Sequence, residues 1–278
     1  MRGIAADITL VAPPTLDEAL ALVAAGHQPI AGGTDLMVLF SSGKLKQRKL
    51  VSLWHLDELR GIEEADDALT FGALTTYSDV QAHPIARSEL GMLVRAGAET
   101  GGWAIQNRGT LGGNIANASP AADSPPALLA YGARVELAGG AGRRWVDYDG
   151  FHTGYKQTVM RPGELITRIR VPRPAARRVE LYRKVGPRKA QAISKVCLAG
   201  LATRGMVRIA LGGVAPIPAR APHAEAAILA RSSPDEVARA LQDDIAPIDD
   251  IRSSAAYRRR VAGNLAAELA RLYNAADL

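Results

Sequence analysis

Hydrophobic and polar positions near the start of the chain follow helical spacing first and extended spacing afterwards. The sequence Thr-Leu-Asp-Glu at 15–18 is typical of a capping box, in which the two outer side chains bind backbone amides of the first turn. We expect a helix to start there and to end at Gly26. A short extended stretch over 29–31 leads into a Gly-Gly pair, and 49–53 has the composition of a further strand. This order predicts a compact α/β unit.

From residue 62 onward, short strands alternate with helices until a proline pair ends the pattern. Helices are predicted at 88–100 and 124–130, the second with Asp123 or Ser124 as its cap and prolines in its first turn. Strands are predicted at 69–73, 134–137 and 164–171. The strand at 134–137 alternates as if one of its faces were wet. We place a domain boundary at Pro172-Arg173-Pro174.

The last third of the chain predicts a smaller sheet covered by helices. Extended spacing recurs at 179–185, 192–203 and 206–211. Apolar residues then recur every four positions at Tyr257, Val261, Leu265 and Leu269. They predict an amphipathic helix over 254–272 with a single apolar stripe that faces the sheet. The expected domains are therefore 1–174, with subdomains of about 1–58 and 59–174, and 175–278.

Composition narrows the class of protein. The 278 residues are 47% hydrophobic and 22% charged, which is enough apolar material for one or two globular cores. The single cysteine, Cys197, excludes an internal disulfide, a four-cysteine zinc site and a cysteine-ligated iron–sulfur cluster on this chain. No apolar run reaches the ~18 residues that a membrane helix needs, and the first seven residues contain no apolar signal core. We expect a cytoplasmic protein with no membrane span.

The net charge of +6 raises the question of a nucleic acid partner. Basic residues occur in short groups separated by acidic or neutral stretches, and aromatic residues make up only 5% of the chain. A protein that reads single strands interleaves aromatic and basic residues. We therefore expect no nucleic acid partner, and we interpret the basic groups as solvated faces or as a docking surface for an acidic partner.

Two segments share one design: Ala31-Gly32-Gly33-Thr34-Asp35 and Thr110-Leu111-Gly112-Gly113-Asn114. Paired glycines can adopt positive φ and allow close approach, so that consecutive amides converge on an anion. A diphosphate would suit both segments together, although either one alone is more often a plain turn. The usual dinucleotide and phosphate-loop fingerprints are absent. The five histidines have neither metal-ligand spacing nor a serine nucleophile motif beside them, so no metal site and no catalytic residue is predicted.

The second glycine segment lies within a longer pattern at 104–132, which reads AIQNRGTLGGNIANASPAADSPPALLAYG. This pattern resembles the FAD-binding, medium subunit of the molybdenum hydroxylases, the family of xanthine dehydrogenase and carbon monoxide dehydrogenase. Residues 31–36 match the other signature of that family, in the right order. The resemblance extends over essentially the whole chain through segments at 71–76, 154–156, 164–166, 181–196, 211–216 and 254–258.

The resemblance implies an α+β fold. It comprises a two-subdomain FAD-binding region of the p-cresol methylhydroxylase and vanillyl-alcohol oxidase class, with FAD between the subdomains, and a smaller C-terminal sheet-and-helix domain. The residues that the resemblance assigns to the cofactor are Ile30, Ala31, Gly32, Gly33, Thr34, Asp35, Leu36, Ala73, Thr110, Gly112, Gly113, Asn114, Asp123, Ile166 and Lys184.

Three of these residues also have simpler interpretations. Asp123 matches an acidic residue that binds a cofactor hydroxyl, but it is equally placed to cap a helix. Ile166 matches an apolar contact to the ring system, which burial alone would also explain. Lys184 matches a lysine at the flavin end, where a positive charge favours the reduced ring, or it is a solvated lysine on a strand.

The resemblance also implies a function. Such a chain is the FAD-carrying electron-transfer subunit of a heterotrimer with an iron–sulfur small subunit and a molybdopterin large subunit, and its acceptor is NAD, a quinone or oxygen. Ile193 matches a position near the exposed ring face, and Gln191 replaces an acidic residue that some members have near the pyridine nucleotide. The basic stretch 183–195 is a hypothesis for docking or acceptor attraction. The alternatives are a standalone flavin oxidase and a non-redox nucleotide-binding assembly protein.

Overall fold

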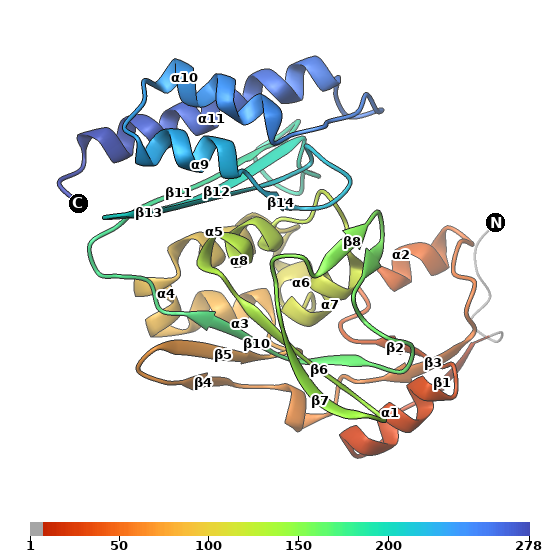
Figure 1. Ribbon diagram of the computed structural model, residues 1–278. Helices are drawn as coiled ribbons and strands as arrows, with labels where there is room; N and C mark the ends of the chain where they lie inside the picture. Colours follow the sequence, from red (N-terminus) through yellow and green to blue (C-terminus); the bar gives the residue numbers. More distant parts are fainter. Residues whose placement is uncertain (1–7) are drawn as a thin grey trace.

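The N-terminal part of the chain forms a small parallel sheet. The computed structural model describes residues 8–278, so the first seven residues, on which the expectation about a signal core rests, lie outside it. The strand order is β1 (Thr9–Val11), β3 (Lys49–Ser52) and β2 (Gln28–Ile30). Helix α1 (Leu16–Ala24) packs on this sheet, and α2 (Leu36–Ser41) follows β2 (Figure 1). Since the strands run parallel, β2 and β3 end at the same edge.

An antiparallel sheet with a layer of helices forms the middle of the molecule. The short helix η2 (Asp57–Leu59) leads into this sheet, whose strand order is β4 (Ile62–Glu64), β5 (Ala68–Gly72), β10 (Leu165–Pro172), β6 (Arg134–Gly139) and β7 (Gly142–Asp147). The helices on one side of it are α3 (Tyr77–Ala82), α4 (Pro84–Glu89), α5 (Gly91–Glu99), α6 (Trp103–Gln106), α7 (Leu111–Asn117) and α8 (Ser124–Tyr131) (Figure 1). Strands β8 (His152–Gly154) and β9 (Gln157–Thr158) form a separate hairpin.

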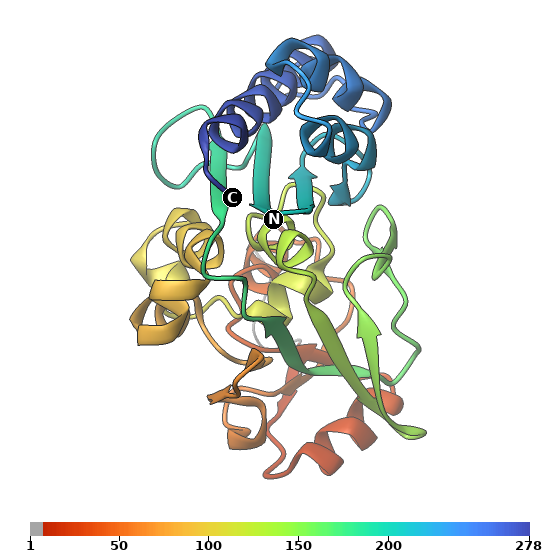
Figure 2. The same ribbon diagram turned by 60° about the vertical axis from the view of Figure 1, so that its left-hand side comes forward.

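A second antiparallel sheet lies between two helical layers (Figure 2). Its order is β11 (Val179–Val185), β12 (Val196–Thr203), β13 (Met206–Gly212) and β14 (Ala219–Arg220). One face packs on α5 and α8, and the other is covered by α9 (Pro222–Leu229), α10 (Pro234–Ala240), η3 (Leu241–Asp243) and α11 (Ala255–Ala275). The largest apolar core is therefore continuous across residue 174. None of the helices within residues 8–278 has the length and apolar character to span a bilayer.

Most of the predicted elements form, although several boundaries move. Thr15 accepts a hydrogen bond from the Glu18 amide at the start of α1, and Gly26 follows its end with a φ of 88°. The helix predicted at 88–100 is instead two helices, α4 and α5, because Leu90 leaves the helical conformation and buries its side chain. The strand predicted at 192–203 starts only at Val196.

Strand β6 is exposed only at its first residue, Arg134, and has no continuous wet face, contrary to the alternation in its sequence. It lies between β10 and β7, and residues 135–138 are all buried. Glu136 remains inside because Thr167 Oγ1 donates to its Oε2 at 2.6 Å and Arg143 Nη1 donates to the same oxygen at 3.1 Å. The charged residue that suggested solvent is therefore satisfied within the protein.

Helix α11 buries a face that is offset from the predicted stripe. Ala262, Ala266 and Leu269 are fully buried, whereas Val261 and Leu265 lie at the edge of the contact. Small side chains at the centre allow the helix axis to approach β12, and the larger residues pack to either side. The stripe was predicted from the spacing of large apolar residues, while the buried face depends on how closely the backbone approaches the sheet.

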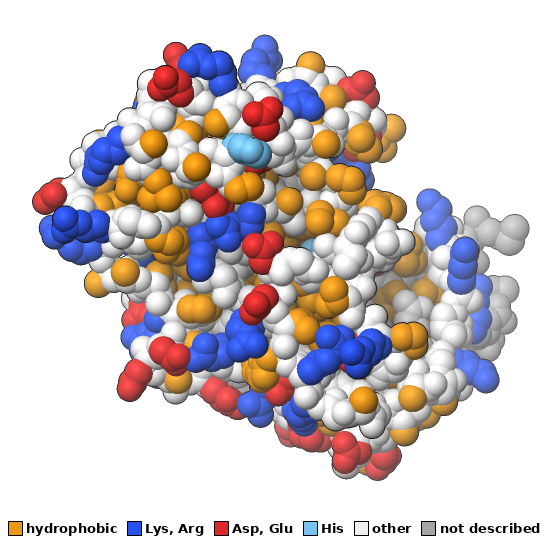
Figure 3. All heavy atoms as spheres, in the orientation of Figure 1, with side chains coloured by type: hydrophobic (Ala, Val, Ile, Leu, Met, Phe, Trp, Pro, Cys, Tyr) orange, Lys and Arg blue, Asp and Glu red, His pale blue; other side chains and the backbone are white. Residues whose placement is uncertain are grey.

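Basic side chains are dispersed over the face shown in Figure 3, between acidic and apolar groups. Many basic side chains among the described residues are paired, as in the ion pair of Arg173 with Glu89 and that of Arg178 with Glu180 at 2.7 Å. The excess positive charge therefore forms no continuous stripe on this face.

We expect Leu269→Ala to lower the free energy of unfolding by about 2–5 kcal/mol, because truncation leaves a cavity between α11 and the sheet. Leu272→Ala is the matched control on the same helix. Leu272 is 41% exposed, so a loss below about 0.5 kcal/mol is expected. Equilibrium urea unfolding measures both values, and equal losses would contradict this packing.

His152 connects the β8–β9 hairpin to α7. Its ring packs edge-on against Tyr148 and Phe151, and Nε2 lies 3.2 Å from the Ile115 carbonyl oxygen. Burial lowers the pKa of His152 below its ordinary value. The neutral imidazole is therefore part of the support beneath α7.

The lowered pKa of His152 predicts acid sensitivity. Since the pKa in the folded state lies below that of the unfolded chain, this contribution is complete above about pH 6.5 and is lost as the pH falls toward the folded value. We expect His152→Gln to flatten the decline of the unfolding free energy between about pH 7.5 and pH 5.5. His55 is exposed, so His55→Gln is the control and should keep the wild-type slope. A wild-type slope in His152→Gln as well would contradict the prediction.

Candidate cofactor site

The two glycine-rich segments that were predicted to act together are in contact. Gly32 follows β2 and lies directly against the turn before α7, where a methyl group at residue 32 would overlap the Arg108 carbonyl oxygen. The Arg108 guanidinium carbon lies 3.7 Å from the ring centre of Trp54, which follows β3. The Asn117 amide donates to the Asp35 carboxylate at 3.2 Å. Backbone and side-chain contacts thus join the small parallel sheet to the helical layer.

The first segment has backbone donors to offer. Gly33 adopts a φ of 76°, which glycine tolerates without strain, and the chain then turns into α2. The amides of Gly32, Gly33, Thr34 and Asp35 donate to no acceptor within residues 8–278. Successive amides in such a turn form a concavity suited to an anion. This segment therefore fits a diphosphate.

The second segment works differently from the prediction. Gly112 and Gly113 have no positive φ, because they lie in the first turn of α7 behind the N-cap Thr110. The amides of 111–114 already donate to Thr75, Ala73 and Thr110. A side chain at Gly112 would lie 2.7 Å from the Ala73 side chain, so glycine there allows close approach of the helix. The second segment therefore offers side chains and lets α7 approach Ala73 closely, whereas the free amides belong to the first segment.

An apolar hollow of about 580 Å³ adjoins the free amides, between α2 and α6. It is lined by Gly33, Thr34, Met37, Val38, Ser41, Ser42 and Ile105. Met37 and Val38 are exposed although they belong to an almost wholly apolar run. Met37 and Val38 were not among the predicted site residues. The sequence feature that could have indicated them is a run more apolar than an exposed helix requires, directly after the glycine pair.

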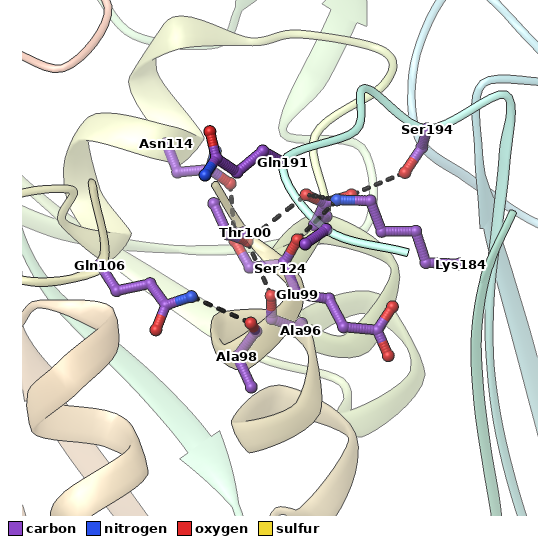
Figure 4. A network of polar contacts seen from close by, with 12 residues as sticks. Ala96, Ala98, Glu99, Thr100, Gln106, Asn114, Ser124, Lys184, Gln191 and Ser194 are labelled. Atoms are coloured by element: carbon purple, nitrogen blue, oxygen red, sulfur yellow. Dashed lines mark hydrogen bonds and ion pairs between the residues drawn. The ribbon is translucent and has the colours of Figure 1, made fainter. Parts of the chain in front are cut away.

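A buried polar network surrounds Asp123 at the start of α8 (Figure 4). Lys184 Nζ donates to Asp123 Oδ2 at 2.6 Å and to the Glu99 carbonyl oxygen at 2.7 Å. Ser194 Oγ donates to Asp123 Oδ1 at 2.7 Å. The network therefore joins the helical layer to β11 and to the segment before β12.

This geometry excludes the simpler interpretations of two residues. Asp123 occupies the N-cap position of α8 but makes no side-chain capping bond, so it is no helix cap. The Lys184 side chain is only 5% exposed, so it is no solvated lysine. Burial raises the pKa of Asp123, while the Lys184 ammonium and the Ser194 hydroxyl act in the opposite direction. A buried charge pair of this kind requires both partners.

Polar groups connect this network to the second glycine segment. Ser124 Oγ donates to Asn114 Oδ1 at 2.6 Å, which leaves the Asn114 amide hydrogens available. Gln191 adopts a φ of 50°, and its side-chain amide lies against Gly102, beside the network shown in Figure 4. Gln106 fixes the intervening turn by donating to the Ala98 carbonyl oxygen at 2.9 Å.

The remaining predicted residues surround these groups. Ile30 ends β2 and packs beside Gly33, while Leu36 begins α2. Ile166 is buried in β10 as part of the large core. Free amides suit an anionic group, an apolar hollow suits an uncharged one, and a buried carboxylate suits a hydroxyl donor, and a dinucleotide has all three kinds of group. The residues present therefore fit FAD.

Comparison with known proteins gives matches along most of the chain. Residues 6–174 match the FAD binding domain in molybdopterin dehydrogenase, and residues 181–272 match the CO dehydrogenase flavoprotein C-terminal domain. The carbon monoxide dehydrogenase medium chain of Hydrogenophaga pseudoflava is 30% identical over 265 residues, covering 91% of this chain and 92% of that protein. The xanthine dehydrogenase FAD-binding subunit of Escherichia coli O157:H7 is 31% identical over 259 residues, covering 88% of each.

A solved structure gives the same result. The carbon monoxide dehydrogenase of Hydrogenophaga pseudoflava that lacks the Mo-pyranopterin moiety of the molybdenum cofactor superposes with a TM-score of 0.89 at 31% identity, covering 94% of this chain and 95% of that one. The expected resemblance and the α+β fold, with its FAD-binding region and C-terminal domain, are confirmed. The chain belongs to the FAD-binding medium subunits of the molybdenum hydroxylases.

Proposed function

We propose that this chain passes electrons from an iron–sulfur small subunit to an external acceptor, in a complex whose large subunit carries molybdopterin. FAD, when bound, supplies the redox centre. The observation that carries the proposal is the contact of Gly32 with Arg108, which sets free amides, an apolar hollow and the second glycine segment side by side. The similarity to a carbon monoxide dehydrogenase medium chain and to a xanthine dehydrogenase FAD-binding subunit supports it.

We assign separate roles to the polar residues of the site. The amides of Gly32–Asp35 donate to the diphosphate, with the Thr34, Thr110 and Asn114 side chains beside them. Asp123 accepts a hydrogen bond from a cofactor hydroxyl. Lys184 holds a positive charge where negative charge accumulates on reduction. The Asp123–Lys184 pair is buried, so its charges act through less solvent than surface charges would.

The acceptor and the substrate belong to the same proposal. NAD, a quinone or oxygen takes the electrons, and the large subunit selects the substrate. The basic stretch predicted to attract the acceptor is smaller than its sequence suggests, because Lys184 is buried and Arg183 pairs with Glu268 at 2.5 Å. Arg188 and Lys189 remain exposed for that role.

The test is reduction of the purified chain. We expect the isolated chain loaded with FAD to stay oxidised with small substrates of the relatives, such as xanthine, and to become reduced once iron–sulfur and molybdopterin partners are added. Reduction of the isolated chain by such a substrate would support a standalone oxidase. Absence of reduction with all partners and substrate present would support a non-redox assembly protein.

We expect Gly32→Ala to raise the dissociation constant for FAD at least about tenfold, a loss of about 1.4 kcal/mol, because the methyl group forces the two segments apart. Gly140→Ala is the matched control, since a side chain there meets nothing within 4 Å. Flavin fluorescence titration measures both constants. If Gly32→Ala binds FAD as tightly as Gly140→Ala, the contact of the two segments is irrelevant to the cofactor.

We expect Lys184→Gln to lower the midpoint potential of the flavin by about 30 mV, which is about 1.4 kcal/mol for a two-electron couple, because a positive charge near the ring is lost. Lys189→Gln removes an exposed charge from the same stretch and should leave the potential unchanged. Spectroelectrochemical titration compares them. An unchanged potential in Lys184→Gln would place this lysine away from the flavin.

A further inference from the structure

The two oxygens of the Asp123 carboxylate have different donors. Oδ2 receives the Lys184 ammonium, whereas Oδ1 receives only the Ser194 hydroxyl at 2.7 Å. Thr100 Oγ1 lies 3.4 Å from Oδ2, but its single hydrogen goes to the Ala96 carbonyl oxygen at 2.7 Å. Ser194 therefore makes the shorter of the two hydroxyl contacts with the Asp123 carboxylate among the described residues.

The backbone around Ser194 fixes the direction of its side chain. The amide of the next residue, Lys195, donates to the Val185 carbonyl oxygen at 2.8 Å, which ties this segment to the end of β11. Lys184 immediately precedes Val185 in β11. Ser194 is 1% exposed and cannot exchange its partner for bulk water. The serine and the lysine are thus held on opposite oxygens of one carboxylate by β11 and the segment that precedes β12.

Removing the Ser194 hydroxyl has a defined electrostatic consequence. A hydroxyl that donates to a carboxylate directs the positive end of its dipole toward the negative charge and lowers the field of that charge nearby. Without it, Asp123 depends on Lys184 alone, and the pair presents a more negative field to its surroundings. A cofactor that becomes more negative on reduction is sensitive to that difference.

We propose that Ser194 is a positioning residue, which holds the Asp123 carboxylate so that Lys184 retains part of its positive field toward the flavin. The inference rests on the proposed function, because it requires FAD at the Asp123–Lys184 pair. Ser194 acts through Asp123, and no direct contact with FAD is implied.

The test is the midpoint potential of FAD-loaded Ser194→Ala, compared with the wild type at one fixed pH. We expect a shift in the same direction as in Lys184→Gln but smaller. Ser194→Thr keeps the hydroxyl and should restore the wild-type potential. A wild-type potential in Ser194→Ala would overturn the proposal.

Matched variants separate the possible failures. Thr100→Val should leave the potential unchanged, because the Thr100 hydrogen is committed to Ala96, and a shift as large as that of Ser194→Ala would overturn the assignment to Ser194. If Ser194→Ala fails to retain FAD, Ser194→Cys, with a weaker donor, replaces it and an unchanged potential there overturns the proposal. An unchanged Lys184→Gln rejects the role assigned to Lys184, and a shifted Lys184→Gln beside an unchanged Ser194→Ala rejects only this inference. The proposed function itself is tested by reduction of the chain in the presence of its partner subunits.

Discussion

The approach of Gly32 to the Arg108 carbonyl is the constraint on which the cofactor site depends. The contact has no room for a side chain, so it determines the distance between the parallel sheet and the helical layer. The stacking of Arg108 on Trp54 acts between the same two layers. The free amides of 32–35 and the hollow that adjoins them lie beside this contact.

The second constraint is a charge pair inside the protein. Burial of Asp123 and Lys184 is costly unless each is well hydrogen-bonded, and the protein meets that condition with Ser194 and the carbonyl oxygen of Glu99. These partners come from the helical layer, from β11 and from the segment before β12. The pair therefore depends on tertiary structure, and its electrostatic properties depend on how three parts of the chain are packed.

Local patterns predicted most of the elements and both glycine segments, because caps, breakers and short-range periodicity act within a few residues. The boundary at Leu90 and the burial of Glu136 could not be predicted, since each depends on packing or hydrogen bonding with distant residues. The same holds for the site. The glycine pairs located both segments in the sequence. The amides at the start of α7 donate to Ala73 and Thr75, which are distant in sequence, so only the first segment keeps amides without an acceptor.

The two faces of the C-terminal sheet belong to two different apolar cores. Its face toward α5 and α8 belongs to the same apolar core as the middle of the molecule, while its other face belongs to the core beneath α11. Cutting the chain after Pro174 would strip α8 of its covering and expose that apolar surface to water. A chimera of two related subunits would keep this apolar core intact only if the C-terminal sheet and α8 came from the same parent.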